Sequence, residues 1–198
     1  IKNGERVLIL GESGIGKSTL LRLIYKYYDV DRGQIFINGY DINDYTLADI
    51  RKNITYISQN EMLYTDSIRN NIILDRNISE NDFLNVCKMT YVDEIIKDNI
   101  LGYDYITEEN GSNLSGGQRQ RIILARGLLK NSKIIMIDEG LSQIDIKLER
   151  IILENLFPNI NKGMILLRAD NWIKLVLLIL STIIFPPIVE ETFFRKNL

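Results

Sequence analysis

The segment GESGIGKST, residues 11–19, combines glycines, a lysine and three hydroxyl side chains at a spacing that suits phosphate binding. A glycine, four further residues and then Gly-Lys-Ser form a loop whose backbone N–H groups turn inward around phosphate oxygens. This phosphate loop follows a short apolar run at residues 6–10 and opens a segment of helical spacing at residues 17–28. Because a helix N-terminus adds partial positive charge, the segment predicts a nucleotide site.

Each part of the phosphate loop has a physical task in binding ATP and Mg2+. Gly14 and Gly16 allow backbone conformations that other residues resist. Lys17 is expected to reach the β- and γ-phosphates, and the hydroxyl of Ser18 is expected to contact Mg2+. The predicted cofactor-binding residues of the loop are Gly11, Glu12, Ser13, Gly14, Ile15, Gly16, Lys17, Ser18 and Thr19.

A pair of acids ends the segment KIIMIDE, residues 133–139. A buried parallel strand delivers the residue after it to the sheet edge where α/β proteins bind their ligands. Asp138 is therefore predicted to organise Mg2+, directly or through water. Glu139 is predicted to be the general base that deprotonates the attacking water. Apolar strands often end in acids, so this prediction depends on the phosphate loop upstream.

The segment NLSGGQRQRIILARGLL, residues 113–129, resembles the LSGGQ signature of ATP-binding cassette (ABC) proteins. The resemblance implies that this signature contacts the γ-phosphate of an ATP held by a second nucleotide-binding domain. It therefore implies a head-to-tail dimer around two ATP molecules. A helix that begins here suits the task, because its first N–H groups face an anion. The ATP-contacting residues of the signature are Ser115, Gly116, Gly117 and Gln118.

The resemblance extends over residues 1–168 and favours the exporter branch of the family, because the segment at residues 60–74 is typical of exporters. Gln59 resembles the family's catalytic and Mg2+-sensing glutamine, and Ser142 and Asp145 stand at family positions in DEGLSQID. The implied partners are a second nucleotide-binding domain and a transmembrane domain. The implied place is the cytoplasmic face of a bacterial cell membrane, and family habit suggests peptide export.

The predicted fold class is α/β, since strands alternate with helices. The resemblance refines this to a P-loop NTPase with ABC ATPase architecture: a mostly parallel core sheet flanked by helices, a small antiparallel part and a helical signature subdomain. Strands are expected at residues 6–10, 33–39, 54–58, 133–138 and 163–167. Helices are expected at residues 17–28, 67–100 with a break near 77–79, and 115–130.

Composition excludes other classes of function more than it selects one. The net charge of −2 across 198 residues gives no basic field, so we expect no nucleic-acid partner and disfavour an ABC ATPase that works on nucleic acid or ribosomes. Cys87 is the one cysteine, so no internal disulfide is possible and its expected role is packing. The chain begins without methionine and reads as part of a longer protein.

One departure from the family pattern concerns turnover. The family places a histidine that contacts the γ-phosphate near residues 168 and 169, and this chain has no histidine. Arg168 and Ala169 stand there instead, and an arginine is a fixed cation that cannot act as a neutral donor and acceptor. The alternative function is therefore a degenerate ABC module that binds ATP with little or no hydrolysis.

The C-terminal segment, residues 169–198, is expected to be an unrelated hydrophobic tail, a possible membrane or fusion segment. Its uncharged stretch at residues 175–189 is shorter than a membrane helix needs and contains Pro186-Pro187. The run EETFFR at residues 190–195 weakly resembles an element of CAAX-protease-like intramembrane proteases. Because that family's metal ligands include histidine, a protease fragment is disfavoured. A fusion, deletion or frameshift and a naturally divergent cassette both remain open.

Overall fold

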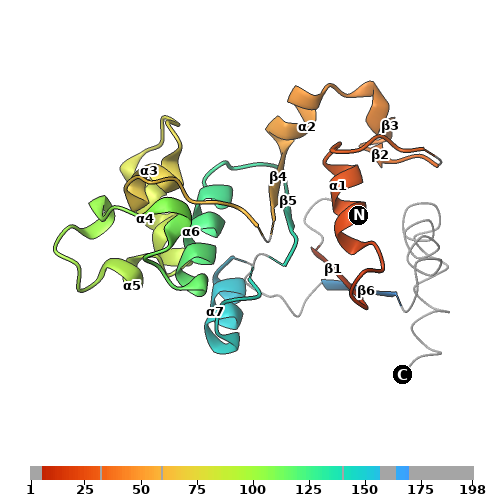
Figure 1. Cartoon of the computed structure of the whole chain (residues 1–198). Coiled ribbons are helices and arrows are strands. Elements are labelled where there is room, and N and C mark those ends of the chain that lie inside the picture. The colour runs from red at the N-terminus through yellow and green to blue at the C-terminus, as the bar shows by residue number, and fades with distance from the viewer. Residues whose placement is uncertain (1–5, 32, 59, 140, 157–163, 170–198) are drawn as a thin grey trace. The chain divides into compact units, whose positions relative to one another are not determined.

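The computed structural model describes residues 6–31, 33–58, 60–139, 141–156 and 164–169 (Figure 1). The chain divides into two compact units, which we describe separately. The first contains residues 1–20 and 159–198, and the second contains residues 21–158. Nothing described tests the predicted domain boundary at residues 168 and 169, which stays a prediction.

The first unit is built on two parallel strands. β1, Arg6–Gly11, pairs with β6, Met164–Ala169, so both strands that the sequence predicts here are present. The register places Leu10 opposite Arg168 and Gly11 opposite Ala169. The position where the family has a histidine therefore lies beside the first residue of the phosphate loop.

Helix α1, Lys17–Ile24, follows the phosphate loop and is shorter than the predicted segment 17–28. It ends because Lys26 adopts a left-handed conformation with φ of 57°. The N–H groups of Lys26 and Tyr27 donate to the carbonyls of Leu23 and Arg22, which satisfies the last turn of the helix. Glycine usually occupies such a left-handed position at the end of a helix. Because a lysine stands here, the sequence carries no stop signal, and the prediction from apolar spacing made the helix too long.

A small antiparallel element begins the described part of the second unit after α1. Strands β2, Phe36–Ile37, and β3, Tyr40–Asp41, are joined by Asn38 and Gly39, both with positive φ, as a tight hairpin turn requires. The predicted strand 33–39 was therefore too long, although its turn is confirmed. A short 3-10 helix, Ile42–Asp44, leads to α2, Leu47–Asn53, which is capped by Thr46.

Strands β4, Ile54–Ile57, and β5, Ile134–Ile137, pair in parallel, with Ile57 opposite Ile137. Their carboxyl ends therefore lie side by side, and Asp138 follows directly after β5. The N–H of Asp138 donates to the carbonyl of Ile57 at 2.9 Å, so the pairing extends one residue beyond the strand. The sequence predicts two functional carboxylates at this edge, Asp138 to organise Mg2+ and Glu139 to act as the general base.

Helices dominate the rest of the second unit (Figure 1). The helices are α3 Ile68–Ile73, α4 Glu80–Met89, α5 Asp93–Ile96, α6 Gly116–Leu128 and α7 Ile146–Leu156, with 3-10 turns at Gly102–Asp104 and Glu109–Gly111. Ser79 caps α4 by accepting from the N–H of Asp82, as predicted. The predicted helix is also interrupted after Met89, where α4 ends, and the apolar pattern did not show this interruption.

The core of this helical part is apolar, and the buried side chain of Arg126 links its segments by hydrogen bonds. Phe83, Cys87 and Ile122 are fully buried, so the predicted packing role of the cysteine is confirmed. Arg126 on α6 donates to the carbonyls of Asn71 and Met62 at 2.7 and 2.8 Å. No helix within the described ranges has the length and hydropathy that a bilayer crossing requires.

Candidate functional site

The phosphate loop is open where a nucleotide phosphate would enter. Gly14 and Gly16 have φ of 81° and 103°, a region that side-chain-bearing residues adopt only with strain. A Cβ placed on either glycine would meet no other atom within 4 Å. Conformation, and not lack of space, therefore demands glycine here, and the space above the loop suits a phosphate group.

The ammonium group of Lys17 lies over its own loop. Its Nζ donates to the carbonyl oxygens of Gly11 at 2.9 Å and Glu12 at 2.7 Å. Carbonyls are neutral acceptors, whereas phosphate oxygens carry negative charge and attract the ammonium group more strongly. The lysine is therefore held in the loop and can exchange these partners for phosphate oxygens.

The start of α1 supplies further donors. The N–H groups in the first turn of a helix have no acceptor within that helix, and Lys17, Ser18 and Thr19 form this turn. The turn contains no acidic residue that would repel an anion. Ser13 and Thr19 are exposed, whereas Ile15 is half-buried and donates its N–H to the carbonyl of Glu12 at 3.4 Å. The geometry of the loop and the helix start agrees with the predicted anion site, which stays a prediction.

Asp138 is held at the carboxyl edge of β4 and β5. It is 9% exposed, and the hydroxyl of Tyr56 on β4 donates to its Oδ2 at 2.7 Å. Burial first, and the Asp138 carboxylate second, raise the pKa of Tyr56 to about 12. The hydroxyl therefore remains a proton donor at neutral pH. The sequence analysis did not identify Tyr56, because no local pattern points to it.

Glu139 lies exposed at a strained position. Its φ is 54°, a left-handed conformation that is unusual for a residue other than glycine. Its carbonyl accepts from the N–H of Ser142 at 3.1 Å, so a tight turn holds the strain. Strained residues of this kind concentrate at functional sites, which agrees with the role predicted for Glu139.

The oxygen donors that the chain offers fit Mg2+, which prefers hydroxyl, carboxylate and phosphate oxygens. The predicted metal set is Ser18, Gln59 and Asp138, of which Gln59 lies outside the described residues. Within the described ranges, no group of three or more His, Cys, Asp or Glu side chains has a metal-binding arrangement. Mg2+ usually binds one or two carboxylates together with substrate phosphates, so a sparse donor set agrees with a metal that arrives with ATP.

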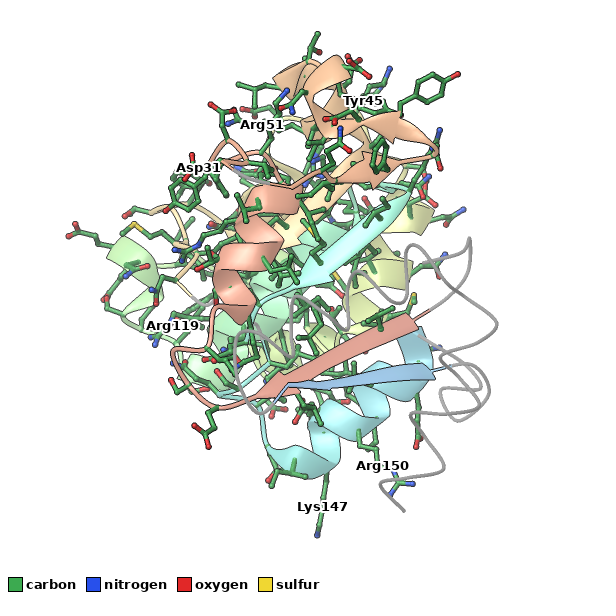
Figure 2. The ribbon with its side chains drawn as sticks, turned by 90° about the vertical axis from the view of Figure 1, so that its right-hand side faces the viewer. Asp31, Tyr45, Arg51, Arg119, Lys147 and Arg150 are labelled. Carbon is green, nitrogen blue, oxygen red and sulfur yellow. The ribbon has the colours of Figure 1, made fainter. Side chains whose placement is uncertain are left out.

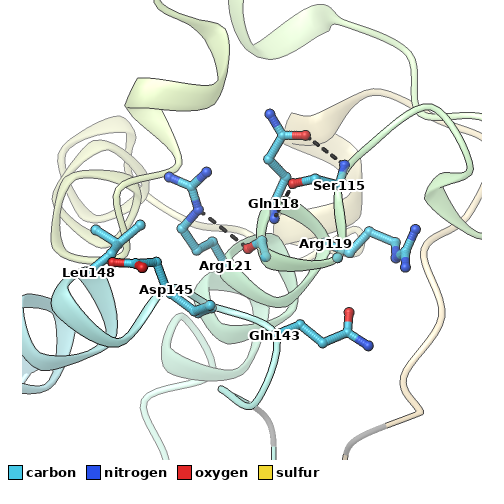
Figure 3. A pocket seen from close by; sticks show the side chains of 10 residues that line it. Ser115, Gln118, Arg119, Arg121, Gln143, Asp145 and Leu148 are labelled. Carbon is cyan, nitrogen blue, oxygen red and sulfur yellow. Dashed lines mark hydrogen bonds between the residues drawn. The ribbon is translucent and has the colours of Figure 1, made fainter.

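The signature segment caps helix α6. The N–H of Gln118 donates to Ser115 Oγ at 3.3 Å, and the N–H of Ser115 donates to Gln118 Oε1 at 2.8 Å (Figure 3). This reciprocal capping box fixes the start of the helix. Ser115 is exposed, so its hydroxyl lies at a helix N-terminus that faces solvent.

The two signature glycines allow a close approach by the segment after Glu139. A Cβ on Gly117 would lie 2.9 Å from the backbone oxygen of Gln143. A Cβ on Gly116 would lie 2.1 Å from the side-chain oxygen of Gln143, which is able to move. The second glycine is therefore the more strictly required for packing.

Gln120 joins the signature helix to the same segment and was missed in the sequence. It is 5% exposed, its Oε1 accepts from the N–H of Gln143 at 2.8 Å, and its Nε2 lies 3.3 Å from Ser142 Oγ. Both the oxygen and the nitrogen of this buried side-chain amide have hydrogen-bond partners, so the amide holds the two segments in one arrangement. No local pattern in the sequence points to this contact.

A pocket lies at the start of α6, and Figure 3 shows it from close by. Arg119 and Arg121 extend from the helix in opposite directions (Figure 3). Arg121 donates to the carbonyl of Tyr91 at 2.7 Å, and burial lowers its pKa. The pocket is lined by Ser115, Gly116, Gly117, Gln118, Arg119, Arg121, Gln143, Ile144, Asp145 and Leu148.

Comparisons with known proteins agree with this arrangement. The family model described as ABC transporter matches residues 1–142. The chain is 39% identical over 158 residues to the leptomycin B resistance protein pmd1 of Schizosaccharomyces pombe, covering 79% of this chain and 12% of that protein. It is 42% identical over 154 residues to the ATP-dependent lipid A-core flippase of Escherichia coli K12, covering 77% of this chain and 26% of that protein.

A solved structure of a bacterial Atm1-family ABC exporter with ATP bound superposes with a TM-score of 0.76 at 34% identity. The match covers 84% of this chain and 30% of that one. The chain therefore spans less than a third of the length of each of these relatives. The comparisons do not support the resemblance of the tail to CAAX proteases, and the tail after Ala169 lies outside the described residues.

Proposed function

Because the chain belongs to the ABC transporter family and is an ATPase domain of the exporter kind, we propose that it binds ATP with Mg2+ and hydrolyses it to power export by a longer transporter. The observation that carries the proposal is the phosphate loop, with left-handed Gly14 and Gly16 and with Lys17 held on two loop carbonyls. Lys17 and the N–H groups of the loop are all hydrogen-bond donors, and the ligand that suits such a set is an anion such as phosphate.

In this proposal the phosphate loop positions ATP. The N–H groups from Gly14 to Thr19 bind phosphate oxygens, and Lys17 moves from its loop carbonyls to the β- and γ-phosphates. The gain comes from replacing neutral acceptors by charged ones. The loop needs no rearrangement of its glycines, because their conformations are already adopted.

The catalytic step depends on positioning and charge. Ser18, Gln59 and Asp138 hold Mg2+, which neutralises charge on the transferring phosphoryl group. Glu139 accepts the proton of the attacking water. Its exposure leaves it accessible to water.

The signature pocket serves a second nucleotide-binding domain. Ser115, Gly116 and Gly117 offer a hydroxyl and a helix N-terminus to the γ-phosphate of an ATP that the partner holds. Gln118 keeps the helix start in place through the capping box. The active form is therefore a head-to-tail dimer.

A transmembrane domain is the second partner, and the ATPase domain works at the cytoplasmic face of the cell membrane. The relatives named above are a resistance protein, a flippase and an exporter, and the match covers 30% or less of each, which leaves room for such a partner in a longer protein. The substrate contacts that membrane part, and the lipid A-core and leptomycin B named for two relatives give no support to peptide in particular.

ATP hydrolysis by the purified chain over a series of protein concentrations tests this function. We expect turnover to rise more steeply than linearly with concentration and to fall at least 100-fold in Glu139→Gln, since general bases contribute about 10²–10⁴-fold. Glu149→Gln on α7 is the matched control and should retain the parent rate. A parent chain that binds no ATP would contradict the proposal.

A degenerate cassette that binds ATP without turnover is the second candidate. It is favoured by Ala169, which ends β6 opposite Gly11, where the family has a histidine. Under this candidate the parent binds ATP but does not hydrolyse it, and Ala169→His restores turnover. Failure of that variant to restore turnover would place the defect elsewhere.

A further inference from the structure

The hydroxyl of Tyr56 contacts the predicted metal-organising carboxylate from a residue 82 positions away in the chain. The Tyr56 hydroxyl and Asp138 Oδ2 are 2.7 Å apart, and both residues are 9% exposed. A carboxylate can rotate about its Cβ–Cγ bond, and a hydrogen bond to one of its oxygens limits that rotation. The hydrogen bond from Tyr56 has this effect on Asp138.

The acceptor settles the direction of the bond, because a carboxylate oxygen accepts and the Tyr56 hydroxyl donates to it. Arg22 on α1 is exposed, and its interactions with Tyr56 and then with Tyr28 raise the pKa of its guanidinium. A guanidinium only donates, so Tyr56 accepts from Arg22 with its oxygen lone pair. A phenol has one proton to give, and that proton is then directed at Asp138.

The ring of Tyr56 is itself held in place. Its centroid lies 5.4 Å from the ring of Tyr25 and 5.9 Å from the ring of Tyr27. The backbone beside it is fixed too, since the carbonyl of Ile57 accepts from the N–H of Asp138 at 2.9 Å. Tyr56 is thus a rigid donor at a fixed distance from the carboxylate.

We propose that Tyr56 is a positioning residue for Mg2+, which fixes the Asp138 carboxylate through Oδ2 so that the carboxylate meets the metal in one orientation. The inference rests on the proposed nucleotide site and adds to it a residue that acts through Asp138. Residues that orient metal-binding groups typically change metal affinity 10–100-fold when they are removed.

The test compares binding of ATP to the full chain in EDTA and across a Mg2+ titration, with a fluorescent ATP analogue as probe. Tyr56→Phe removes the hydroxyl and keeps the ring. We expect the Mg2+ concentration for half-maximal enhancement of binding to rise about tenfold. Binding in EDTA should stay within about twofold of the parent value, since the phosphate loop is untouched and a twofold change is below about 0.5 kcal/mol.

Tyr45→Phe is the matched control, because its hydroxyl donates to the carbonyl of Ile37 at 2.9 Å beside the β2–β3 hairpin (Figure 2). This variant loses a comparable hydrogen bond, and its Mg2+ dependence should equal that of the parent. The proposal is overturned if Tyr56→Phe and Tyr45→Phe have the same Mg2+ dependence. Equal losses in EDTA and in Mg2+ would likewise assign Tyr56 a purely structural role.

Arg22→Met covers the case in which Tyr56→Phe does not fold, because Arg22 is exposed. It removes the guanidinium that interacts with the Tyr56 hydroxyl, and we expect a smaller shift of about two- to threefold in the same direction. No shift in a folded Arg22→Met together with an unfolded Tyr56→Phe would contradict the proposal. A parent chain that binds no ATP contradicts the nucleotide site as well, whereas a parent that binds normally isolates the failure to Tyr56.

Discussion

The phosphate loop at residues 11–19 and the signature segment at residues 114–118 each lead into the N-terminus of a helix, where a phosphate is expected to bind. The two segments hold that helix start in different ways. In the phosphate loop, glycines with positive φ hold the backbone open and Lys17 brings a positive charge. In the signature segment, Ser115 and Gln118 cap the helix with their own side chains.

This difference has a physical consequence for binding. Lys17 donates to two carbonyls of the phosphate loop itself, whereas Arg121 near the signature donates to the carbonyl of Tyr91, outside the signature, and burial lowers its pKa. In the proposed function Lys17 places its charge where the phosphate would bind, so the phosphate loop is expected to bind ATP in a single chain. The signature segment offers a hydroxyl and N–H groups, which suit a phosphate already held by another domain.

The largest expected effect is on the charge of the phosphate loop. Lys17→Met should weaken ATP binding by roughly 100-fold or more, because two hydrogen bonds to a charged group contribute about 1.5–3 kcal/mol each. Equilibrium binding of a fluorescent ATP analogue measures this. Lys26→Met is the control, since Lys26 also donates to two carbonyls, those of Ile42 and Tyr45. Equal losses in both variants would remove the distinction between the two anion sites.

An intermediate effect is expected from the close approach at the signature. Gly117→Ala should lower the free energy of unfolding by about 1–3 kcal/mol, because its Cβ meets the backbone oxygen of Gln143. Gly116→Ala should cost less, because it meets a movable side chain. Urea denaturation of both variants gives the comparison, and ATP binding to the single chain should change in neither. A greater loss for Gly116→Ala would contradict the packing argument.

The smallest effect concerns the helix cap. Ser115→Ala and Ser79→Ala each remove an N-cap and should each cost about 1 kcal/mol of stability. Only Ser115→Ala should also weaken ATP-dependent dimerisation, which sedimentation velocity measures in a Glu139→Gln background. If both variants dimerise like the parent, Ser115 is a cap and nothing more.

Many of the strands, caps and turns could be predicted from short stretches of the sequence. Residues 6–10, 54–58 and 133–138 are strands within a residue or two, and the cap at Ser79 and the turn at Asn38-Gly39 are where the sequence places them. These features depend on short-range sterics and hydrogen bonds, which residue types report directly. The early end of α1 was missed because a lysine, and not a glycine, takes the left-handed position at residue 26.

The residue types expected to meet a phosphate could be predicted before any fold was known, because the spacing of the glycines, Lys17 and the signature indicates their chemistry. The groups that hold these residues became visible only in the folded chain. Tyr56 reaches Asp138 across 82 residues, and Gln120 reaches Gln143 across 23. Such contacts depend on how strands pair and helices pack over long loops, and no local pattern of residues encodes that pairing.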